Sequence, residues 1–289
     1  MLAIVGTVPD TEFPLVSGRV TLENDTLTID GKSVWVNRGT PALLGAAVKA
    51  CEALGGQDVT GFLVGDTGLG KGSRKLYRYL TENLPPMTIH TMAFHYLQPD
   101  VDWHNKIVFA VEAMAKKPVM IADAGFMYAA KMSGQADFYD LFTPDAGELA
   151  FLADETAPHP FYTRGFILHE NNKVDDLIQR AYRHGNGARY LLVKGSEDQV
   201  ADAGGVIARV DTPAVAAMEA MGGTGDTLTG IATALVATGM AIPKAAKIAA
   251  QANRIAGFHA APTPATQIIE VIREIPRALA QVLKEDETG

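Results

Sequence analysis

The chain has 289 residues, of which 47% are hydrophobic and 20% charged, and its formal net charge is −8. This composition is typical of a folded protein, and an acidic balance without a basic run argues against a nucleic-acid partner. No stretch reaches the ~18 consecutive apolar residues that span a bilayer, residues 1–10 lack a secretory signal and the single Cys51 excludes an internal disulfide, so we expect a cytoplasmic protein without a membrane partner.

The first forty residues are expected to be rich in β structure. Alternating side chains in segments 19–23, 26–30 and 33–36, separated by Asn-Asp and Asp-Gly pairs, predict hairpins. A helix is predicted to begin near Pro41 and to end at the Gly-Gly pair of residues 55–56.

From residue 59 onward, short apolar runs alternate with segments of helical spacing. The runs predict strands at 59–64, 88–94, 118–123, 140–143, 189–193 and 206–210, and the spacing predicts helices at 74–80, 107–114, from near 145, and at 174–183, 227–238, 243–259 and 268–283. Such alternation implies right-handed crossovers and a mostly parallel sheet. We find no repeat and no linker, and expect one α/β domain over residues 1–289 with a β-rich segment over 1–38.

Four polar turns follow predicted strands or precede a predicted helix. They are Asp123, the run from Thr143 to Glu148, the run Lys194-Gly195-Ser196, and the run from Gly222 to Asp226. Because ligands bind beyond the carboxyl ends of parallel strands, these turns are candidates for one active site.

The run Gly-Gly-Thr-Gly-Asp at 222–226 carries the most chemistry. Its glycines let the backbone approach a ligand, and the helix that follows offers free N–H groups and a positive dipole end for a phosphate. An Asp in this turn can take the proton of a substrate hydroxyl during phosphoryl transfer. The alternative is that Asp226 only caps its helix.

The segment from Gly223 to Gly239 resembles the signature of the ribokinase-like superfamily, and within it the chain is most similar to the NAD(P)H-hydrate dehydratase family. Further segments resemble that family in the same order, from about Gly39 onward: Arg38-Gly-Thr-Pro-Ala-Leu-Leu-Gly-Ala-Ala47, Ile121-Ala-Asp-Ala124, Phe142-Thr-Pro-Asp-Ala-Gly-Glu148, Val193-Lys-Gly195 and residues 265–279. The resemblance implies a three-layer α/β/α sandwich with a mostly parallel central sheet.

The resemblance also implies roles for the matching residues. Asp226 would handle the proton, the backbone of Gly223, Thr224 and Gly225 would form an anion hole, and Lys194, Gly195 and Ser196 would line the nucleotide. Asp123, Thr143, Asp145 and Glu148 would lie near phosphate and Mg²⁺, which no protein side chain would bind directly, since Mg²⁺ keeps most of its waters. The plain alternatives are a first-turn acid for Glu148 and a solvated strand end for Lys194.

The implied cofactors are ATP or ADP with Mg²⁺, the implied partner is a small hydroxylated substrate, and relatives of this kind are usually oligomeric, which implies a homo-oligomer. Two departures bear on the substrate. The family's His-Pro pair is Asp145-Ala146 here, and the segment 65–70 matches the family's Gly-Pro-Gly-Leu-Gly turn only in part.

Gly65 to Lys71 nearly matches a phosphate-binding P-loop, but residue 72 is Gly where that motif needs Ser or Thr. A strand-to-helix turn is the preferred interpretation.

The segment from His95 to His104 is interpreted as a loop. Its irregular spacing argues against a metal cluster, and His95, Asp100 and Asp102 are candidate substrate contacts, with a loop packed by Trp103 as the alternative. His159 and His169 are interpreted as ordinary surface or core residues.

Three functions therefore stand open. The first is an ADP- or ATP-dependent NAD(P)H-hydrate dehydratase, which phosphorylates the hydrate hydroxyl and then eliminates phosphate. The second is an ATP-dependent small-molecule or sugar kinase, in which the phosphoester is the product. The third is a non-catalytic nucleotide-binding protein. Asp226 serves both enzymes equally, and the order of the motifs favours the dehydratase.

Overall fold

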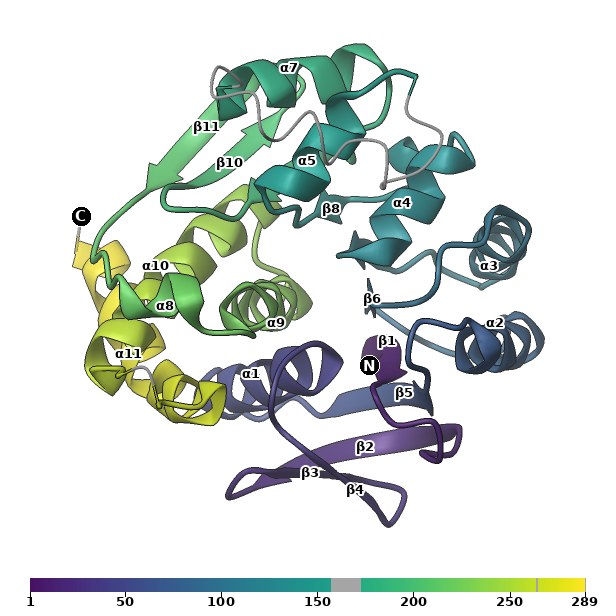
Figure 1. Cartoon of the computed structure of the whole chain (residues 1–289), viewed down its shortest axis with the longest axis horizontal. Coiled ribbons are helices and arrows are strands. Elements are labelled where there is room, and N and C mark those ends of the chain that lie inside the picture. The colour runs from purple at the N-terminus through teal and green to yellow at the C-terminus, as the bar shows by residue number, and fades with distance from the viewer. Residues whose placement is uncertain (157–172, 264, 289) are drawn as a thin grey trace.

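The computed structural model in Figure 1 describes residues 1–156, 173–263 and 265–288, so His159 and His169 lie outside the described residues. In the described ranges, eleven strands form one sheet in the order β11-β10-β9-β8-β7-β6-β1-β5-β2-β3-β4. The strands are β1 (Leu2–Val8), β2 (Val16–Glu23), β3 (Thr26–Ile29), β4 (Lys32–Trp35), β5 (Val59–Gly65), β6 (Thr91–His95), β7 (Val119–Ala122), β8 (Leu141–Phe142), β9 (Tyr190–Val193), β10 (Asp198–Asp202) and β11 (Gly205–Val210).

The middle of the sheet is parallel, and both of its ends are antiparallel. Strand β1 pairs in parallel with β5 and β6, and the parallel series continues through β7 and β8 to β9. The hairpin β10–β11 closes one end, and the meander β2–β3–β4 closes the other. The central part of the sheet is therefore parallel, as the sequence predicts, and antiparallel strands extend it at both ends.

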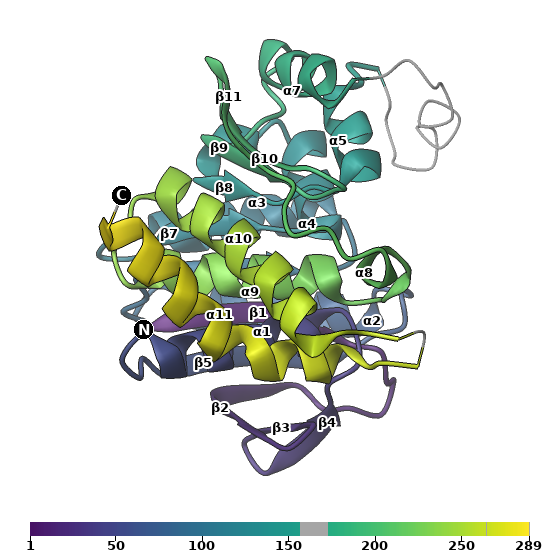
Figure 2. The same cartoon turned by 90° about the vertical axis from the view of Figure 1, so that its left-hand side faces the viewer.

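Helices cover both faces of the sheet (Figures 1 and 2). One face of the sheet packs against α1 (Thr40–Ala53), α9 (Thr224–Ala237), α10 (Ile242–Ala260) and α11 (Ile268–Thr288). The other face packs against α2 (Lys71–Asn83), α3 (Val101–Glu112), α4 (Gly125–Met132), α5 (Ala146–Ala153) and α7 (Val174–Arg183). A short helix α8 (Ala217–Ala220) precedes α9. The three-layer α/β/α sandwich is therefore confirmed, and no described helix is long and apolar enough to cross a membrane.

Strand β1 shows why the sheet separates two cores. Leu2 and Ile4 point into the layer with α1, whereas Ala3 and Val5 point into the layer with α2, and all four are fully buried. A continuous apolar run of this kind is what a central parallel strand requires. The segment 1–38 is β-rich as predicted, but its first strand lies in the centre of the sheet and only β2 to β4 form the outer meander (Figure 1).

Acid is expected to destabilise the fold through His104, a fully buried residue of α3. Its Nε2 lies 2.8 Å from the Tyr139 hydroxyl and its Nδ1 2.9 Å from Ser133 Oγ, and burial lowers its pKa from 6.5 to about 4. Between these two values the unfolded chain binds a proton that the folded chain does not, so the free energy of unfolding falls as the pH falls. The full effect is about 3 kcal/mol, at 1.36 kcal/mol for each pKa unit.

Urea unfolding of the wild type and of His104→Gln near pH 7 and near pH 4.5 measures this effect. We expect the variant to lose less stability between the two pH values than the wild type does, because glutamine does not titrate. Equal losses in both proteins would contradict the assignment.

Candidate active site

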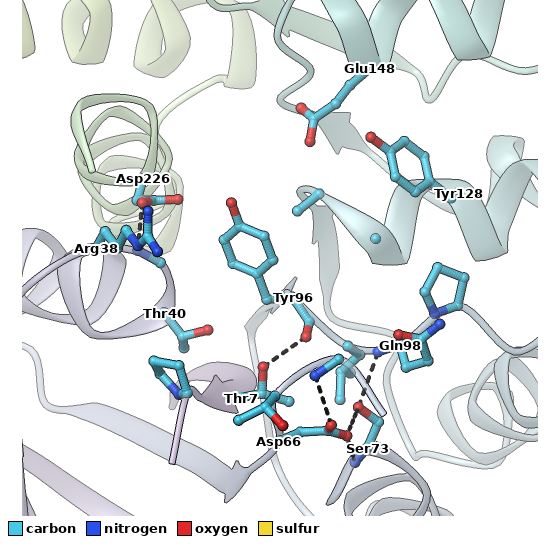
Figure 3. A pocket seen from close by; sticks show the side chains of 18 of the residues that line it. Thr7, Arg38, Thr40, Asp66, Ser73, Tyr96, Gln98, Tyr128, Glu148 and Asp226 are labelled. Atoms are coloured by element: carbon cyan, nitrogen blue, oxygen red, sulfur yellow. Dashed lines mark hydrogen bonds between the residues drawn. The ribbon is translucent and has the colours of Figure 1, made fainter. Parts of the chain in front are cut away.

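A cavity of about 940 Å³ opens at the carboxyl ends of the parallel strands (Figure 3). Its wall includes residues from the ends of four neighbouring strands and from two helices: Thr7, Asp66, Tyr96, Ala124, Glu148 and Asp226. This is where an open α/β sheet binds its ligands.

Asp226 lies in the first turn of α9 and reaches the cavity wall. Its Oδ2 accepts a hydrogen bond from the Gly39 N–H at 2.7 Å, and its Oδ1 lies 3.0 Å from His95 Nε2. Burial alone would raise the pKa of this carboxyl, but His95, Lys194 and the Gly39 N–H hold the pKa below its ordinary value. Asp226 is therefore an ionised acceptor that faces the cavity.

The N-terminus of α9 is built to approach an anion. Gly223 is its N-cap at φ 105°, and no described side chain caps the helix through a hydrogen bond. A Cβ on Gly223 would lie 2.9 Å from Ile268 Cγ1, so both the conformation and the space require glycine. The first N–H groups of a helix have no partner within it. Gly222 and Gly223 line the cavity, whereas Thr224 and Gly225 do not.

Three predicted site residues form a network beneath the cavity. Asp123, Thr143 and Lys194 are the first residues after β7, β8 and β9. Lys194 Nζ lies 2.8 and 3.0 Å from the two oxygens of Asp123, whose side chain is 1% exposed. Thr229 of α9 donates its hydroxyl to Asp123 Oδ2 at 2.6 Å and lies 3.0 Å from Thr143 Oγ1.

This network joins the sheet to the helix that carries Asp226. Burial alone would lower the pKa of Lys194, but Asp123 and Glu148 raise it above its ordinary value. The solvated strand end considered for Lys194 is therefore wrong. The structure places Lys194 behind the cavity wall, where its side chain lies 3.4 Å from the position of a Cβ on Gly225.

Gly195 and Ser196 form a turn whose polar groups are occupied by the protein. Arg254 of α10 donates to both carbonyl oxygens at 2.9 Å and to Asp198 Oδ2 at 2.8 Å, and the Gly195 N–H donates to Asp198 Oδ1 at 3.1 Å. Neither residue lines the cavity. Their role toward a nucleotide stays a prediction, and Arg254, which sequence reasoning missed, is what fixes the turn.

Asp145 and Glu148 begin α5 with a capping box. Asp145 Oδ1 accepts from the Glu148 N–H at 2.7 Å, and Glu148 Oε2 accepts from the Asp145 N–H at 2.8 Å. Glu148 is thus a first-turn acid, and both residues also line the cavity. Burial, opposed by Lys194, raises the pKa of Glu148 to about 8.

The segment from Gly65 to Ser73 is a strand-to-helix turn and not a P-loop. Asp66 Oδ1 accepts from the N–H groups of residues 68, 69 and 70, and Asp66 Oδ2 accepts from the N–H and the hydroxyl of Ser73. The amides that would cradle a phosphate therefore bind the chain's own carboxylate. Residue 72 must be glycine because a Cβ would lie 2.0 Å from the Gly65 oxygen.

Asp66→Ala is expected to lower the free energy of unfolding by roughly 2–3 kcal/mol, because five donors lose their charged acceptor. Asp66→Asn keeps one acceptor oxygen and should lose about half as much. Urea unfolding of both variants is the measurement, and a stability of Asp66→Ala equal to that of the wild type would show that the turn does not depend on this carboxylate.

The segment from His95 to His104 is only partly a loop, so that interpretation needs correction. His95 ends β6, and α3 already begins at Val101. Asp100 caps α3 by accepting from the Trp103 N–H at 3.2 Å, and Asp102 lies exposed in its first turn. Neither Asp lines the cavity, whereas residues 96–99 do.

The predicted site residues did not include Tyr96, Tyr128 and Arg38, whose side chains also line the cavity (Figure 3). Tyr96 and Ala124 have φ values of 50°, which few non-glycine residues adopt and which occur often at functional sites. A single sequence carries no signal for such a conformation in tyrosine or alanine.

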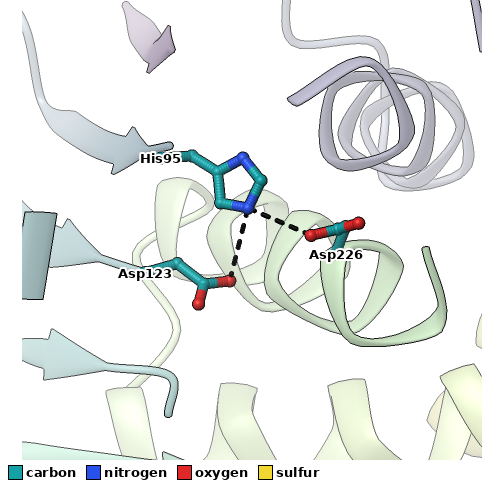
Figure 4. A group of neighbouring side chains, drawn as sticks. All are labelled: His95, Asp123 and Asp226. Carbon is teal, nitrogen blue, oxygen red and sulfur yellow. Dashed lines mark ion pairs between the residues drawn. The ribbon is translucent and has the colours of Figure 1, made fainter. Parts of the chain in front are cut away.

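His95, Asp123 and Asp226 converge beneath the cavity (Figure 4). Among the described residues, their potential ligand atoms all lie within 4.8 Å of one another. Sequence reasoning expected no metal bound directly by side chains, and the spacing of these residues along the chain, 28 and 103 positions apart, could not reveal the cluster.

Comparison with solved structures identifies the fold. The chain is similar to a ribokinase-like superfamily protein from Enterococcus faecalis, with 14% identity over 97% of this chain and 86% of that one and a TM-score of 0.60. It is also similar to phosphofructokinase-2 from Escherichia coli in complex with substrates and products, with 14% identity over 97% of this chain and 99% of that one and a TM-score of 0.55. Pyridoxal kinase from Staphylococcus aureus in complex with pyridoxal is similar too, with 15% identity over 87% of this chain and 85% of that one and a TM-score of 0.53. The fold is ribokinase-like, as predicted.

Comparison of sequences identifies the family. Residues 98–277 match the family described as NAD(P)H-hydrate dehydratase, and the chain belongs to this carbohydrate kinase family. An uncharacterized protein of Methanocaldococcus jannaschii is 40% identical over 243 residues, which are 84% of this chain and all of that protein. The matched region contains Asp123, Glu148, Lys194 and Asp226 and begins three residues after His95.

Proposed function

We propose that this protein is an ADP- or ATP-dependent NAD(P)H-hydrate dehydratase. The observation that carries the proposal is the ionised carboxylate of Asp226 on the cavity wall, beside the N-terminus of α9. Membership of the dehydratase family supports the choice of substrate. The cavity has the volume of a small-molecule site.

The residues present fit a nucleotide phosphate and Mg²⁺. The N-terminus of α9 offers N–H donors and the positive end of the helix dipole, as an anion requires. Asp145 and Glu148 each use one oxygen in the capping box, which leaves the other oxygen for water-mediated contacts to a cation. When bound, ATP or ADP would supply the phosphoryl group and Mg²⁺ would neutralise its charge.

The residues of the chain then act on the hydroxyl of the hydrate. Asp226 takes the hydroxyl proton as the substrate oxygen bonds to phosphorus and the donor's phosphorus–oxygen bond breaks. Elimination follows: the ring carbon–oxygen bond breaks, inorganic phosphate leaves, and a proton is lost from the adjacent ring carbon as the double bond forms. The products are NAD(P)H, phosphate and the shortened nucleotide.

A small-molecule kinase is the second candidate, favoured by one feature of the cavity. Residues 96–99 line it, and the family's Gly-Pro-Gly-Leu-Gly turn has no clear counterpart in the chain. The kinase needs only the first step, and its phosphoester would be the product.

The test is incubation of the protein with hydrated NADH, Mg²⁺ and either ATP or ADP, followed by the return of reduced-nicotinamide absorbance. Recovery with the wild type and not with Asp226→Asn supports the dehydratase and identifies the donor. Nucleotide consumption on a panel of hydroxylated metabolites, without recovery of NADH, supports the kinase. Nucleotide binding without consumption of any substrate would replace both with a non-catalytic binding protein.

A further inference from the structure

His95 is a buried histidine to which the proposed mechanism gives no role. It is the last residue of β6, it is 0% exposed, and it stands between Thr40 on one side and the carboxylates of Asp226 and Asp123 on the other (Figure 4). Burying the two ring nitrogens of an imidazole costs free energy unless they have partners, so the contact between this ring and the proposed proton acceptor needs a chemical explanation.

The surroundings of the ring decide where its proton lies. Nε2 is 3.0 Å from Asp226 Oδ1 and 3.9 Å from Asp123 Oδ2, and carboxylates only accept hydrogen bonds. Nε2 therefore carries a proton. Nδ1 lies 3.0 Å from Thr40 Oγ1, and in the neutral ring it accepts the Thr40 hydroxyl proton, which fixes this tautomer.

Packing holds the ring in place. His95 pairs with Gly6 of β1, where a Cβ would lie 2.5 Å from Thr40 Oγ1 and 2.7 Å from the His95 oxygen. The glycine therefore lets Thr40 and His95 approach the sheet together. In this resting arrangement the Nε2–H is directed squarely at neither carboxylate, and a small movement of Asp226 would align the bond.

We propose that His95 is a positioning residue for Asp226: its Nε2–H, fixed by Thr40, holds the Asp226 carboxylate in its ionised form and in one orientation. The Gly39 N–H donates to Oδ2 and His95 Nε2 lies 3.0 Å from Oδ1, so each oxygen of the carboxylate has an N–H group beside it that opposes rotation away from the cavity. The inference rests on the proposed function, because it takes Asp226 to be the proton acceptor.

A metal ion bound by His95, Asp123 and Asp226 is the competing account, and the contacts of Asp123 oppose it. Lys194 and Thr229 already donate to Asp123 Oδ2, at 3.0 and 2.6 Å. A cation bound to this oxygen would lie beside the Lys194 ammonium and be repelled by it.

Other charged groups lie near Asp226 and are common to all variants in the test. Lys194 and the phenol of Tyr96 interact with its charge, a potential ligand atom of Asp123 lies within 4.8 Å of one on Asp226, and Glu148 lines the same cavity. Because the variants below leave these groups in place, a change in the titration of Asp226 reports on His95.

The test compares His95→Phe, which removes the donor, with His95→Gln, which keeps an N–H donor, and with Thr40→Val, which removes only the hydroxyl behind the ring. His104→Phe is the matched control, because His104 is equally buried and lies outside the site. The ¹³C resonance of the Asp226 carboxyl, assigned with Asp226→Asn, is followed against pH without any substrate. We expect the pKa of Asp226 to rise by about one unit in His95→Phe, by less in Thr40→Val, and to stay near the wild-type value in His95→Gln and His104→Phe.

If hydrate repair is measurable, the acidic limb of its pH profile should move by the same amount in the same variants. An unchanged titration of Asp226 in both His95→Phe and Thr40→Val would overturn the proposal, and Thr40→Val serves alone if His95→Phe does not fold. One equivalent of Zn²⁺ or Mn²⁺ bound by the wild type and lost in His95→Gln would overturn it in favour of a metal site. If the variants titrate as expected but the wild type repairs no hydrate, the proposed function is refuted and the role of His95 toward Asp226 stays supported.

Discussion

Asp226→Asn is expected to lower kcat/KM by about 10³-fold, within the 10²–10⁴ that a positioned acid or base contributes, while the protein stays folded. The amide keeps the size of the carboxylate and one oxygen for the Gly39 N–H, but it cannot accept the substrate proton. The measurement is turnover of hydrated NADH, with the free energy of unfolding measured on the same samples.

Asp102→Asn is the matched control, because it makes the same chemical change at an exposed position of α3 outside the cavity. We expect it to keep wild-type turnover. If Asp226→Asn were also fully active, Asp226 would have no part in proton transfer.

Lys194→Met is expected to lower the free energy of unfolding by about 3–5 kcal/mol, since it leaves the buried Asp123 carboxylate without its cation. Urea unfolding measures the loss. The double variant Lys194→Met with Asp123→Asn removes both charges, and it should recover much of the stability because no uncompensated charge remains buried.

An exposed ion pair provides the control for this substitution. Lys49 bonds to Glu52 at 2.7 Å with side chains 26% and 52% exposed, and Lys49→Met should change the stability by less than about 1 kcal/mol. A loss in Lys194→Met no larger than that in Lys49→Met would mean that the buried ion pair adds little to the stability of the fold.

Local patterns were enough to predict the α/β class, the mostly parallel sheet and a residue that lies on the wall of the candidate site. Helix α7 occupies the predicted residues 174–183, and Asp226 was found because glycines and a helix start lie beside it in sequence. Asp123, Thr143 and Lys194 were selected because each follows a predicted strand. Strand β10 and helix α4 were not predicted, and Ala124, which precedes α4, has a backbone conformation that alanine does not signal.

The contacts that give the site its chemistry could not be predicted from one sequence. His95 approaches Asp226 across 131 residues, and Arg254 reaches the turn at Gly195 across 59. At the Gly65 segment the sequence correctly disfavoured a phosphate loop through the glycine at position 72, but it did not show that the Asp66 side chain occupies the amides. In each case a tertiary contact decides the role of the residue.

The packing of α1 has a consequence for how the chain is made in the cell. The helix is complete at residue 53, but α9 and α11, which cover its apolar face, begin at residues 224 and 268. At ~5–20 residues per second, a ribosome needs roughly 10–30 s to add the residues between α1 and α9. During that time a helix with residues such as Leu43, Leu44 and Val48 has no native partner on that face. The nascent chain is therefore expected to depend on chaperones until its last quarter emerges, and the site can form only after synthesis is nearly finished.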